Sequence, residues 1–313
     1  MMTRPACPYC TKTAPTDAPK SNRGNVCKFG FFSRKGRRTR FQRYRCGTCN
    51  KLFSEATFRE EYRQKKRHLN QLMFKALTSG SSLRQTARCL NLSYKTVASR
   101  LPYFERVSRN YHEEFLKKVT PDGGFTKIQF DDMETSEHTK LKPLSLPITV
   151  EASRRYILFF DAVSMPAKGH LAEISRKKYG LRADHRAIGW NNVLGATAKI
   201  AAKNATVTSD SHKSYPFFLK SHIPLCTHIR TPSRKACVVG QGELKRGGHD
   251  PLFSFNHTAA MHRAHINRLF RRTWCTTKRP DRLKSHMAMY SMWHNELILA
   301  KVEGRKYRLP FRV

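Results

Sequence analysis

Hydrophobic and polar positions divide the chain into three zones. Residues 1–56 show little periodicity and are rich in Cys, Gly, Pro and basic residues. Residues 57–118 carry apolar side chains at helical spacing, which predicts three or four short helices. From residue 123 onward, alternating and continuous apolar runs predict strands separated by helices. The turn-rich segment TPDGG at 120–124 marks the last boundary, so we expect three domains: 1–56, 57–118 and 123–313.

The middle zone has the pattern of a helix-turn-helix. A first helix is expected over 61–78, and its buried side comprises Leu69, Leu72, Met73, Ala76 and Leu77. Two helices follow in SLRQTARCLNLSYKTVASRL, where Ser93 caps the second and Pro102 is expected to end it. The side chains left for the major groove are Tyr94, Lys95, Thr96, Ser99 and Arg100. An ordinary helical hairpin is the alternative.

The last zone predicts a mixed sheet. Strands are expected at 127–130, 146–150, 156–160, 205–209 and near 226–230, with a helix at 171–179. Three strands followed by alternating helices and strands is the order of a ribonuclease-H-like sheet. A final helix is expected to start at Pro280 and to bury Leu283, Met287, Tyr290 and Leu297, a structural role.

Four cysteines in the first zone have the spacing of a metal site. They form two C-x2-C knuckles, Cys7/Cys10 and Cys46/Cys49, and two such turns give the four sulfurs of a tetrahedral zinc ion. Cys27 is an alternative ligand, and four unrelated reduced thiols are the bland alternative. With no apolar secretion signal at the start of the chain, this pairing favours metal over disulfides.

Charge indicates the partner. Lys and Arg number 60 against 22 Asp and Glu, a formal net charge of +38. Such a surplus repels itself unless a polyanion neutralises it, and double-stranded DNA is the expected one. A basic run lies between the knuckles, and its candidate phosphate contacts are Arg37, Arg38, Arg40 and Arg43. A merely basic soluble protein is the alternative. No membrane segment is expected, and the predicted location is the cytoplasm.

Acidic residues are scarce, so those beside predicted strands are informative. Asp131 and Asp132 follow the strand at 127–130, and Asp210 follows the strand at 205–209. Two carboxylates at the ends of neighbouring strands can share a pair of Mg²⁺ ions for phosphodiester transfer. The alternatives are turn or capping roles, with Asp210 as the N-cap of a helix.

Several motifs in this order resemble those of DDE-type transposases of the group typified by insertion sequence one. They are CPYC, YRCGTCNKLFSEAT, SLRQTARCLNLSYKTVASRL, QFDDMETSEHTKLKPL, TVTSDSHKSYP and NRLFRRTWCTTK. The resemblance covers most of the chain. It implies that Asp131 and Asp210 are the first two catalytic acids, that Asp132 stands where the family often has Glu, and that Mg²⁺ or Mn²⁺ is used. It also implies a bacterial, nucleoid-associated protein that acts as a homo-oligomer on DNA.

The third acid departs from the family pattern. The usual Glu position falls on Asn256, with His257 beside it, and these two are the expected third catalytic residues. An amide or an imidazole can ligate or orient but leaves less negative charge. Asn256 as a helix N-cap is the alternative. Glu243 and Asp250 are further candidates for the acid.

A basic helix is expected after Asn256. Ile266, Leu269 and Phe270 would form its apolar stripe, continued by Trp274. Its exposed arginines, next to the acids, are expected to hold a DNA backbone, and the candidates are Arg268, Arg271 and Arg272.

Together these features predict a multidomain protein: a zinc ribbon, an all-α helix-turn-helix and a C-terminal α/β ribonuclease-H-like domain. The predicted function is a transposase that binds the ends of an insertion sequence and catalyses DNA cleavage and strand transfer. The rivals are a catalytically inactive, transposase-derived DNA-binding regulator and a nuclease without strand transfer.

Overall fold

The computed structural model describes residues 5–10, 25–33, 40–232, 244–245, 248–270 and 275–311. The chain divides into two compact units, Met1–Arg67 and His68–Val313. Among the described residues, no helix is both long and apolar enough to cross a membrane.

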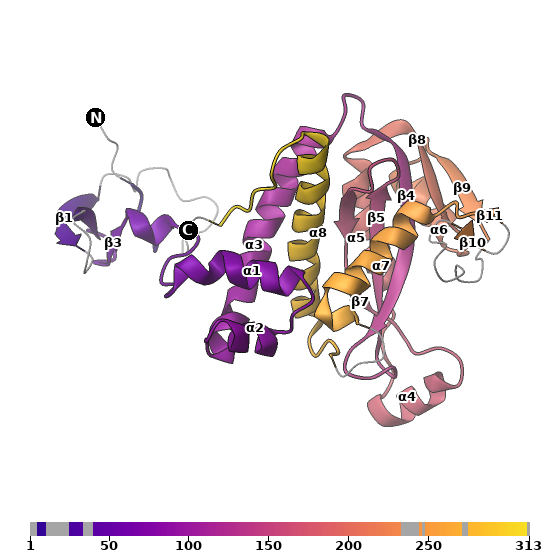
Figure 1. Ribbon diagram of the computed structural model, residues 1–313, viewed down its shortest axis with the longest axis horizontal. Helices are drawn as coiled ribbons and strands as arrows, with labels where there is room; N and C mark the ends of the chain where they lie inside the picture. Colours follow the sequence, from indigo (N-terminus) through magenta and orange to yellow (C-terminus); the bar gives the residue numbers. More distant parts are fainter. Residues whose placement is uncertain are drawn as a thin grey trace. The chain divides into compact units, whose positions relative to one another are not determined.

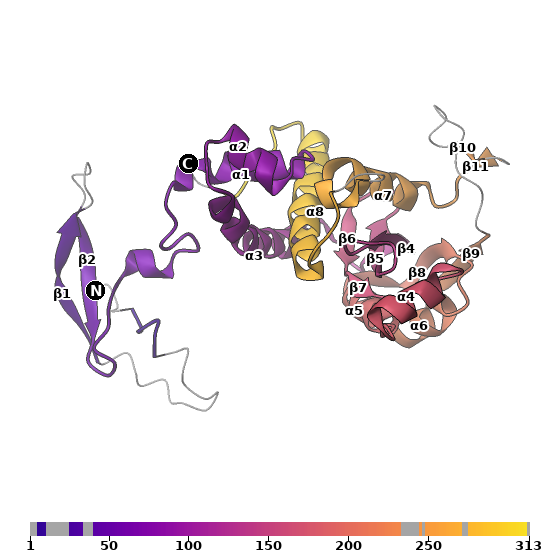
Figure 2. The ribbon, with the colours of Figure 1, turned by 90° about the horizontal axis from the view of Figure 1, so that it is seen from below.

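The first unit is a small antiparallel sheet with a cysteine-rich core. Its strands lie in the order β1 (Val26–Ser33), β2 (Arg40–Cys46) and β3 (Leu52–Ser54), and the short helix η2 (Glu55–Phe58) follows (Figure 2). Its core consists of Cys7, Val26, Tyr44, Cys46 and Phe53. Because the core cluster of the described part of this unit has only five side chains, the apolar core alone is small for independent stability.

The second unit opens with η3 (Arg67–Leu69) and three helices, α1 (Asn70–Thr78), α2 (Leu83–Cys89) and α3 (Tyr94–Val119). Ser82 caps α2 in a capping box with Gln85, and Ser93 caps α3 as predicted. The prediction of a helix over 61–78 is wrong in its first half. Arg63 and Lys66 have φ of 63° and 53°, a left-handed conformation that no α-helix continues through. Leu72 is also exposed rather than buried.

The expectation that Pro102 ends the second helix of the pair is wrong, because α3 is a single helix of 26 residues that continues through Pro102 to Val119. A proline inside a helix removes one backbone hydrogen bond and costs about 3 kcal/mol. The continuation buries Phe104, Phe115 and Leu116 completely or nearly so, and α3 packs along α8 (Pro280–Val302) (Figure 1). Burial of these large side chains offsets the loss.

The centre of the second unit is a mixed sheet. Its strand order is β6 (Ile157–Phe160), β5 (Pro143–Glu151), β4 (Phe125–Ser136), β8 (Ala201–Asp210) and β9 (Thr227–Thr231), with β7 (Val163–Ser164) paired to β5. Strand β5 is antiparallel to both of its neighbours, β6 and β4, whereas β8 and β9 run parallel to β4. The remaining elements are α4 (Leu171–Tyr179), α5 (Arg186–Ala198), α6 (Tyr215–His222), β10 (Leu244–Lys245), β11 (Gly248–His249), α7 (Phe253–His265) and η4 (Asn267–Leu269).

Helices cover both faces of this sheet. On one face Trp190 and Leu194 of α5 and Phe218 of α6 pack on Phe130 and Val207. On the other face α7 and α8 pack on β4 and β5. A third core joins α8 to the three N-terminal helices through Met289, Met292, Phe74 and Phe104. The helix-turn-helix segment and the sheet therefore belong to one compact unit that is joined by α8 (Figure 1).

Two expectations for the last zone are wrong. The basic helix after Asn256 ends at His265, because Ile266 has extended backbone with φ −103° and ψ 105°. Ile266 and Leu269 are nevertheless buried, so their apolar spacing reflects packing of the turn η4. The final helix starts at Pro280 as predicted and buries three of the four expected side chains, but Leu297 is exposed.

Candidate active site and metal centre

The register of the central strands brings the two predicted acids together. Strands β4 and β8 pair in parallel, and the last pair is Phe130 with Ser209. The next residues on the two strands are Asp131 and Asp210. Asp131 does not end its own strand, because β4 continues to Ser136. Strand β8 ends at Asp210, so the acids lie side by side where β8 leaves the sheet.

Both acids lie on the face of the sheet that α7 covers. The Gln129 side chain donates to Pro251 O and accepts from Phe255 N, so it points towards α7. Side chains alternate along a strand, and Asp131 therefore shares the face of Gln129. On β8, Val207 and Ser209 point to the α5 side, where Val207 joins the core, which leaves Asp210 on the α7 face.

The two carboxylates repel one another. Burial, together with the neighbouring charge of Asp210, raises the pKa of Asp131 to about 7. Two hydrogen bonds to Asp131 Oδ1 oppose the shift, one from Asp132 N at 2.7 Å and one from Tyr215 Oη at 3.2 Å. A pair of like charges at this spacing is the arrangement that a divalent cation relieves.

Asp132 occupies the opposite face and is held rigidly. Its carboxylate accepts from Trp190 Nε1 of α5 at 3.0 and 3.1 Å and from Ser145 Oγ of β5 at 2.6 Å. Burial raises the pKa of Asp132 to about 6, and these donors counteract part of that effect. Its lone pairs are occupied by protein donors, so Asp132 fixes the strand beside Asp131 instead of facing the same cation.

Asn256 lies on α7, where its side chain is bound to Asp250. It is the fourth residue of α7, so it is not the N-cap, which is Leu252. Its Nδ2 donates to Asp250 Oδ2 at 2.8 Å. Asp250 is buried and also accepts from Leu252 N at 3.1 Å, which ties the start of α7. Asp250 thus satisfies the helix start, and the other alternative acid, Glu243, lies outside the described residues.

His257 lies near the turn between β5 and β6 and near α8. Its charged neighbours are Arg155, in the turn between β5 and β6, and His294 of α8. That turn follows Glu151, which pairs with Ile128 of β4. Ile128 lies three residues before Asp131 along the strand. Across the described part of the chain, no third Asp, Glu, His or Cys brings a ligand atom within reach of both Asp131 and Asp210. The expectation of His257 as a third catalytic residue is therefore not supported by its position.

The donor set at Asp131 and Asp210 fits Mg²⁺ or Mn²⁺. Both supply carboxylate oxygens, the hard ligands that these ions prefer, and both remain partly exposed, which leaves room for coordinated water. Two protein carboxylates are enough for Mg²⁺, which usually keeps several waters.

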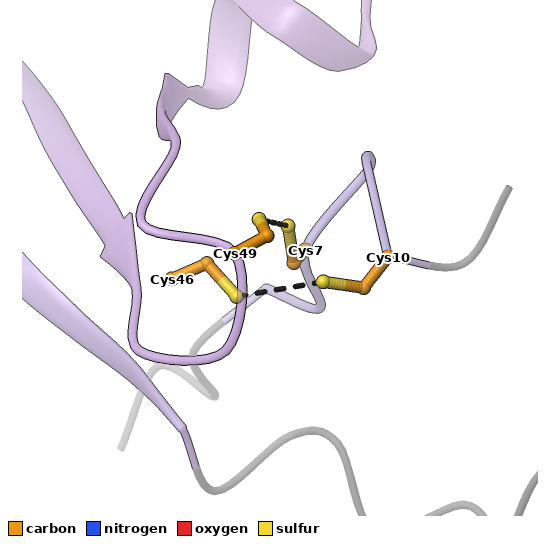
Figure 3. A group of neighbouring side chains, drawn as sticks. All are labelled: Cys7, Cys10, Cys46 and Cys49. Carbon is orange, nitrogen blue, oxygen red and sulfur yellow. Dashed lines mark hydrogen bonds between the residues drawn. The ribbon is translucent and has the colours of Figure 1, made fainter. Parts of the chain in front are cut away.

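The four predicted cysteines meet in the first unit. Cys7 and Cys10 come from the N-terminal turn, and Cys46 and Cys49 from the turn after β2 (Figure 3). The Sγ atoms of Cys7 and Cys49 are 3.6 Å apart, and those of Cys10 and Cys46 are 3.7 Å apart (Figure 3). Sulfurs around a tetrahedral zinc ion, each at roughly 2.3 Å, lie about 3.8 Å from one another. The four-cysteine group therefore has the geometry of a zinc site.

The four thiols differ in how readily they ionise. Burial opposes ionisation of Cys46, but the N–H groups of Cys49 and Thr48, together with the thiols of Cys10 and Cys7, outweigh it and lower the pKa of Cys46 to about 6. Burial raises the pKa of Cys7, and hydrogen bonding with Cys49 raises that of Cys10. Cys27 is exposed and outside the group, and its thiol lies 3.6 Å from Arg45 O. Cys27 is therefore not one of the four grouped thiols.

The predicted DNA-reading side chains of α3 divide into two sets. Tyr94, Lys95 and Ser99 are exposed, and Thr96 is half-buried with its Oγ1 bound to Ser93 Oγ. Arg100 is buried, with Nε donating to Asn70 Oδ1 at 3.2 Å. The prediction that Arg100 faces the major groove is wrong, because its guanidinium joins α3 to α1.

The remaining predicted phosphate contacts are partly described. Arg40 is exposed at the start of β2, whereas Arg43 donates to Phe31 O at 3.3 Å. Arg268 is half-buried near η4. The other four candidates lie outside the described residues. They are Arg37, Arg38, Arg271 and Arg272.

Tyr215 binds Asp131, whereas Trp190 and Ser145 bind the adjacent Asp132, and sequence reasoning missed all three. Trp190 lies on α5, a helix that was not predicted. The run SHKSYP after Asp210 does carry a signal for Tyr215, since a large aromatic five residues after a strand-end acid packs back on the sheet, its ring centroid 4.7 Å from that of Phe130.

Comparisons with known proteins give structural neighbours only. No protein-family model matches the chain, and no curated protein matches it. The Mos1 strand transfer complex is 9% identical, with a TM-score of 0.24 over 79% of this chain and 80% of that chain. The catalytic domain of Mos1 mariner transposase is 12% identical, with a TM-score of 0.23 over 66% of this chain and 95% of that chain. A pre-cleavage Mos1 transpososome gives 8% identity, a TM-score of 0.19, and coverage of 79% and 81%. Likeness at this level does not establish a shared activity.

Proposed function

We propose that this chain is a DNA transposase that cleaves and joins phosphodiester bonds with divalent metal ions. The observation that carries the proposal is the placement of Asp131 and Asp210 on neighbouring parallel strands, with coupled charges, on one face of a mixed sheet. The sheet, with three antiparallel strands followed by two parallel ones, supports a ribonuclease-H-like catalytic domain.

The DNA-binding parts support the same function. The capped helix pair α2 and α3 exposes Tyr94, Lys95 and Ser99, which suits a helix-turn-helix reading the major groove. The four-cysteine group suits a zinc ribbon, and a net charge of +38 suits a polyanionic partner. We propose that these parts bind the ends of a mobile element of the insertion sequence one group, with the chain acting as a homo-oligomer on DNA.

Each side chain has a defined task in this account. Asp131 and Asp210 hold the divalent ions, which when bound supply activation of a water or a 3′-hydroxyl and stabilisation of the leaving oxygen. Tyr215 orients Asp131 through its 3.2 Å hydrogen bond, and Trp190 fixes Asp132 and thereby the strand. Asn256 orients the start of α7 through Asp250 rather than binding metal.

The test uses isosteric variants of the acids in the full chain. Wild type should nick and rejoin a plasmid carrying the gene with its flanking sequence in the presence of Mn²⁺. Asp131→Asn and Asp210→Asn should lose the product roughly a thousandfold, yet retain DNA binding in a gel-shift assay. Asp122→Asn, an exposed acid just before β4, is the matched control and should behave as wild type. Full activity of Asp210→Asn would show that the catalytic proposal is wrong.

An inactive DNA-binding regulator is the second candidate. It is favoured by one observation, the lack of a third carboxylate beside Asp131 and Asp210 in the described residues. If the chain is a regulator, wild type, Asp131→Asn and Asp210→Asn should all repress a reporter placed behind the element end to the same extent. None of the three proteins should then yield cleaved DNA.

A further inference from the structure

Two cavities meet between the helix-turn-helix and the far end of β4. The larger has a volume of about 880 Å³, and its walls include Glu134, Lys140 and Lys278. Its sides are tied together, since His138 N donates to Thr277 O at 2.7 Å. The smaller, of about 230 Å³, opens beside Tyr94 at the start of α3. Arg268 and Thr276 line both cavities, so the two adjoin at these side chains, and we call them together the passage.

The passage is positively charged. Lys140 and Lys278 are exposed, and neither has a carboxylate partner in the described part of the chain. Glu134 is the one acid in the described lining of the larger cavity, and it is paired with Lys168. An anionic occupant would therefore meet cations without losing affinity to a nearby free carboxylate.

Arg268, where the cavities join, lacks a partner of its own. Its guanidinium is half-buried, and burial lowers its pKa, yet it makes no hydrogen bond or ion pair with any described residue. A guanidinium carries five N–H donors, and removing such a charge from water is costly unless an acceptor replaces the water. His286, 3% exposed, also lines the smaller cavity with its Nε2 buried and without a partner. Two unsatisfied nitrogen-bearing side chains facing one passage indicate a missing anion.

The ends of the passage indicate which anion. One end lies at Tyr94, the first residue of the proposed recognition helix. The other reaches Thr135, four residues past Asp131 and on the same face of β4, which is roughly 13 Å along the strand. The larger cavity is of the size that holds a drug-sized ligand. It is too small for a DNA duplex, whose major groove alone is about 12 Å wide. Phe270 lies in its wall and offers an aromatic face for a base.

We propose that this passage holds an unpaired strand of DNA on its way from α3 to the acid pair, and that Arg268 binds a backbone phosphate of that strand. The proposal rests on the proposed function. Beyond that function, it states that the DNA substrate is locally unpaired before cleavage and that Arg268 binds the unpaired strand.

The experiment compares two DNA probes with the full-length chain. One is a blunt duplex, and the other is the same duplex with a short unpaired tail. Wild type should bind the tailed probe about tenfold more tightly, the gain of a phosphate contact with a stacked base. Arg268→Gln should lose this preference and lower the salt dependence by about one counterion. Arg268→Lys, which keeps the charge, should retain part of the preference.

The matched control is Arg154→Gln, an exposed arginine in the turn between β5 and β6, which should keep the full preference. The unfolding midpoint of Arg268→Gln should equal or exceed that of wild type, because a half-buried unpaired charge is removed, so misfolding is distinguished from lost binding.

Three outcomes separate the possibilities. A tail preference that survives in Arg268→Gln would overturn the proposal. Inorganic phosphate that raises the unfolding midpoint of wild type but not of Arg268→Gln, with no tail preference in either, would show a free-anion site and overturn the assignment to DNA. Loss of the preference in Arg268→Gln together with full cleavage by Asp210→Asn would support this site and contradict the proposed catalysis.

Discussion

The four-cysteine group and the acid pair are both candidate metal sites, and they differ in how completely the protein fills the coordination sphere. Four thiols converge in the first unit with every Sγ within 4.8 Å of the others. At the sheet, two carboxylates meet and no third Asp, Glu, His or Cys of the described residues joins them. A closed sphere suits a structural ion, and an open one suits an ion that must also bind substrate and water.

The two sites also relate differently to the fold around them. The first unit has five core side chains, two of them ligands, so its ion would replace much of the missing apolar core. The acid pair lies on a sheet with large cores on both faces and is a source of repulsion within it. Metal should therefore stabilise the first unit by creating its fold, and the second by relieving strain between charges.

The largest effect is expected from breaking the closed site. Cys46→Ala removes one of four ligands, and because a structural zinc ion contributes on the order of 10 kcal/mol to such a fold, the first unit should unfold. Limited proteolysis should then cut within residues 1–67 while 68–313 survives. Cys89→Ala, an exposed cysteine of α2, is the control and should leave the digestion pattern and zinc content unchanged. Protection of the first unit in Cys46→Ala would show that the metal does not hold it.

A second prediction concerns pH in the absence of metal. The pKa of Asp131 is raised to about 7 in the folded chain from 3.8, so between these values the folded state holds a proton that the unfolded state has released. The contribution of Asp131 to the free energy of unfolding should therefore fall as pH rises through this window, by about 4 kcal/mol in total. Asp131→Asn cannot titrate and should be more stable than wild type above pH 7, by chemical denaturation, with the difference vanishing near pH 4. A difference that does not change with pH would contradict the repulsion.

This difference must be measured against Asp131→Asn because other groups titrate in the opposite sense. Burial lowers the pKa of His262 and His286 to about 3, so their contributions fade as pH drops below 6.5. Subtracting the variant curve from the wild-type curve cancels both histidines, since neither touches Asp131. Added Mn²⁺ should abolish the Asp131-dependent slope.

A third prediction tests whether position 256 supplies a metal ligand to the site of Asp131 and Asp210. Asn256→Asp places a second carboxylate 2.8 Å from Asp250 Oδ2, so it should destabilise the chain at neutral pH by about 2 kcal/mol. Mn²⁺ affinity, measured by calorimetry, should remain unchanged. Asn256→Ala, which removes the amide without adding charge, serves as the control. Tighter Mn²⁺ binding by Asn256→Asp would instead identify position 256 as the third ligand.

The smallest effect is expected at Cys27, whose exposed thiol lies outside the four-cysteine group. Cys27→Ser should change stability by less than about 0.5 kcal/mol and leave the zinc stoichiometry at one per chain. Loss of zinc in this variant would reopen the ligand assignment.

Much of the fold follows from local patterns. The helix predicted at 171–179 coincides with α4, and every predicted strand lies within or overlaps an observed one. Helix α5 was missed because its sequence contains Gly189 and Gly195, which disfavour an isolated helix. Tertiary packing requires the first of them, since a Cβ on Gly189 would lie 2.9 Å from Val163 Cγ2. The extension of α3 past Pro102 likewise depends on α8, which is almost two hundred residues away.

The candidate site was predictable as far as strand positions reach. The four cysteines could be chosen from their spacing, and Asp131 and Asp210 from their places directly after predicted strand residues, although β4 continues past Asp131. The supporting residues could not, because Trp190 and Tyr215 reach the acids through helix packing that no short-range pattern encodes. The burial of Arg100 was hidden for the same reason, since its partner Asn70 belongs to another helix.

The account stands or falls on whether Asp131 and Asp210 hold the same metal ions. Crystals of the chain soaked in Mn²⁺ should show anomalous scattering density within about 2.2 Å of a carboxylate oxygen of each acid, with no other protein ligand beyond water. Density at one acid alone, or at neither while the four-cysteine group is filled, would contradict it.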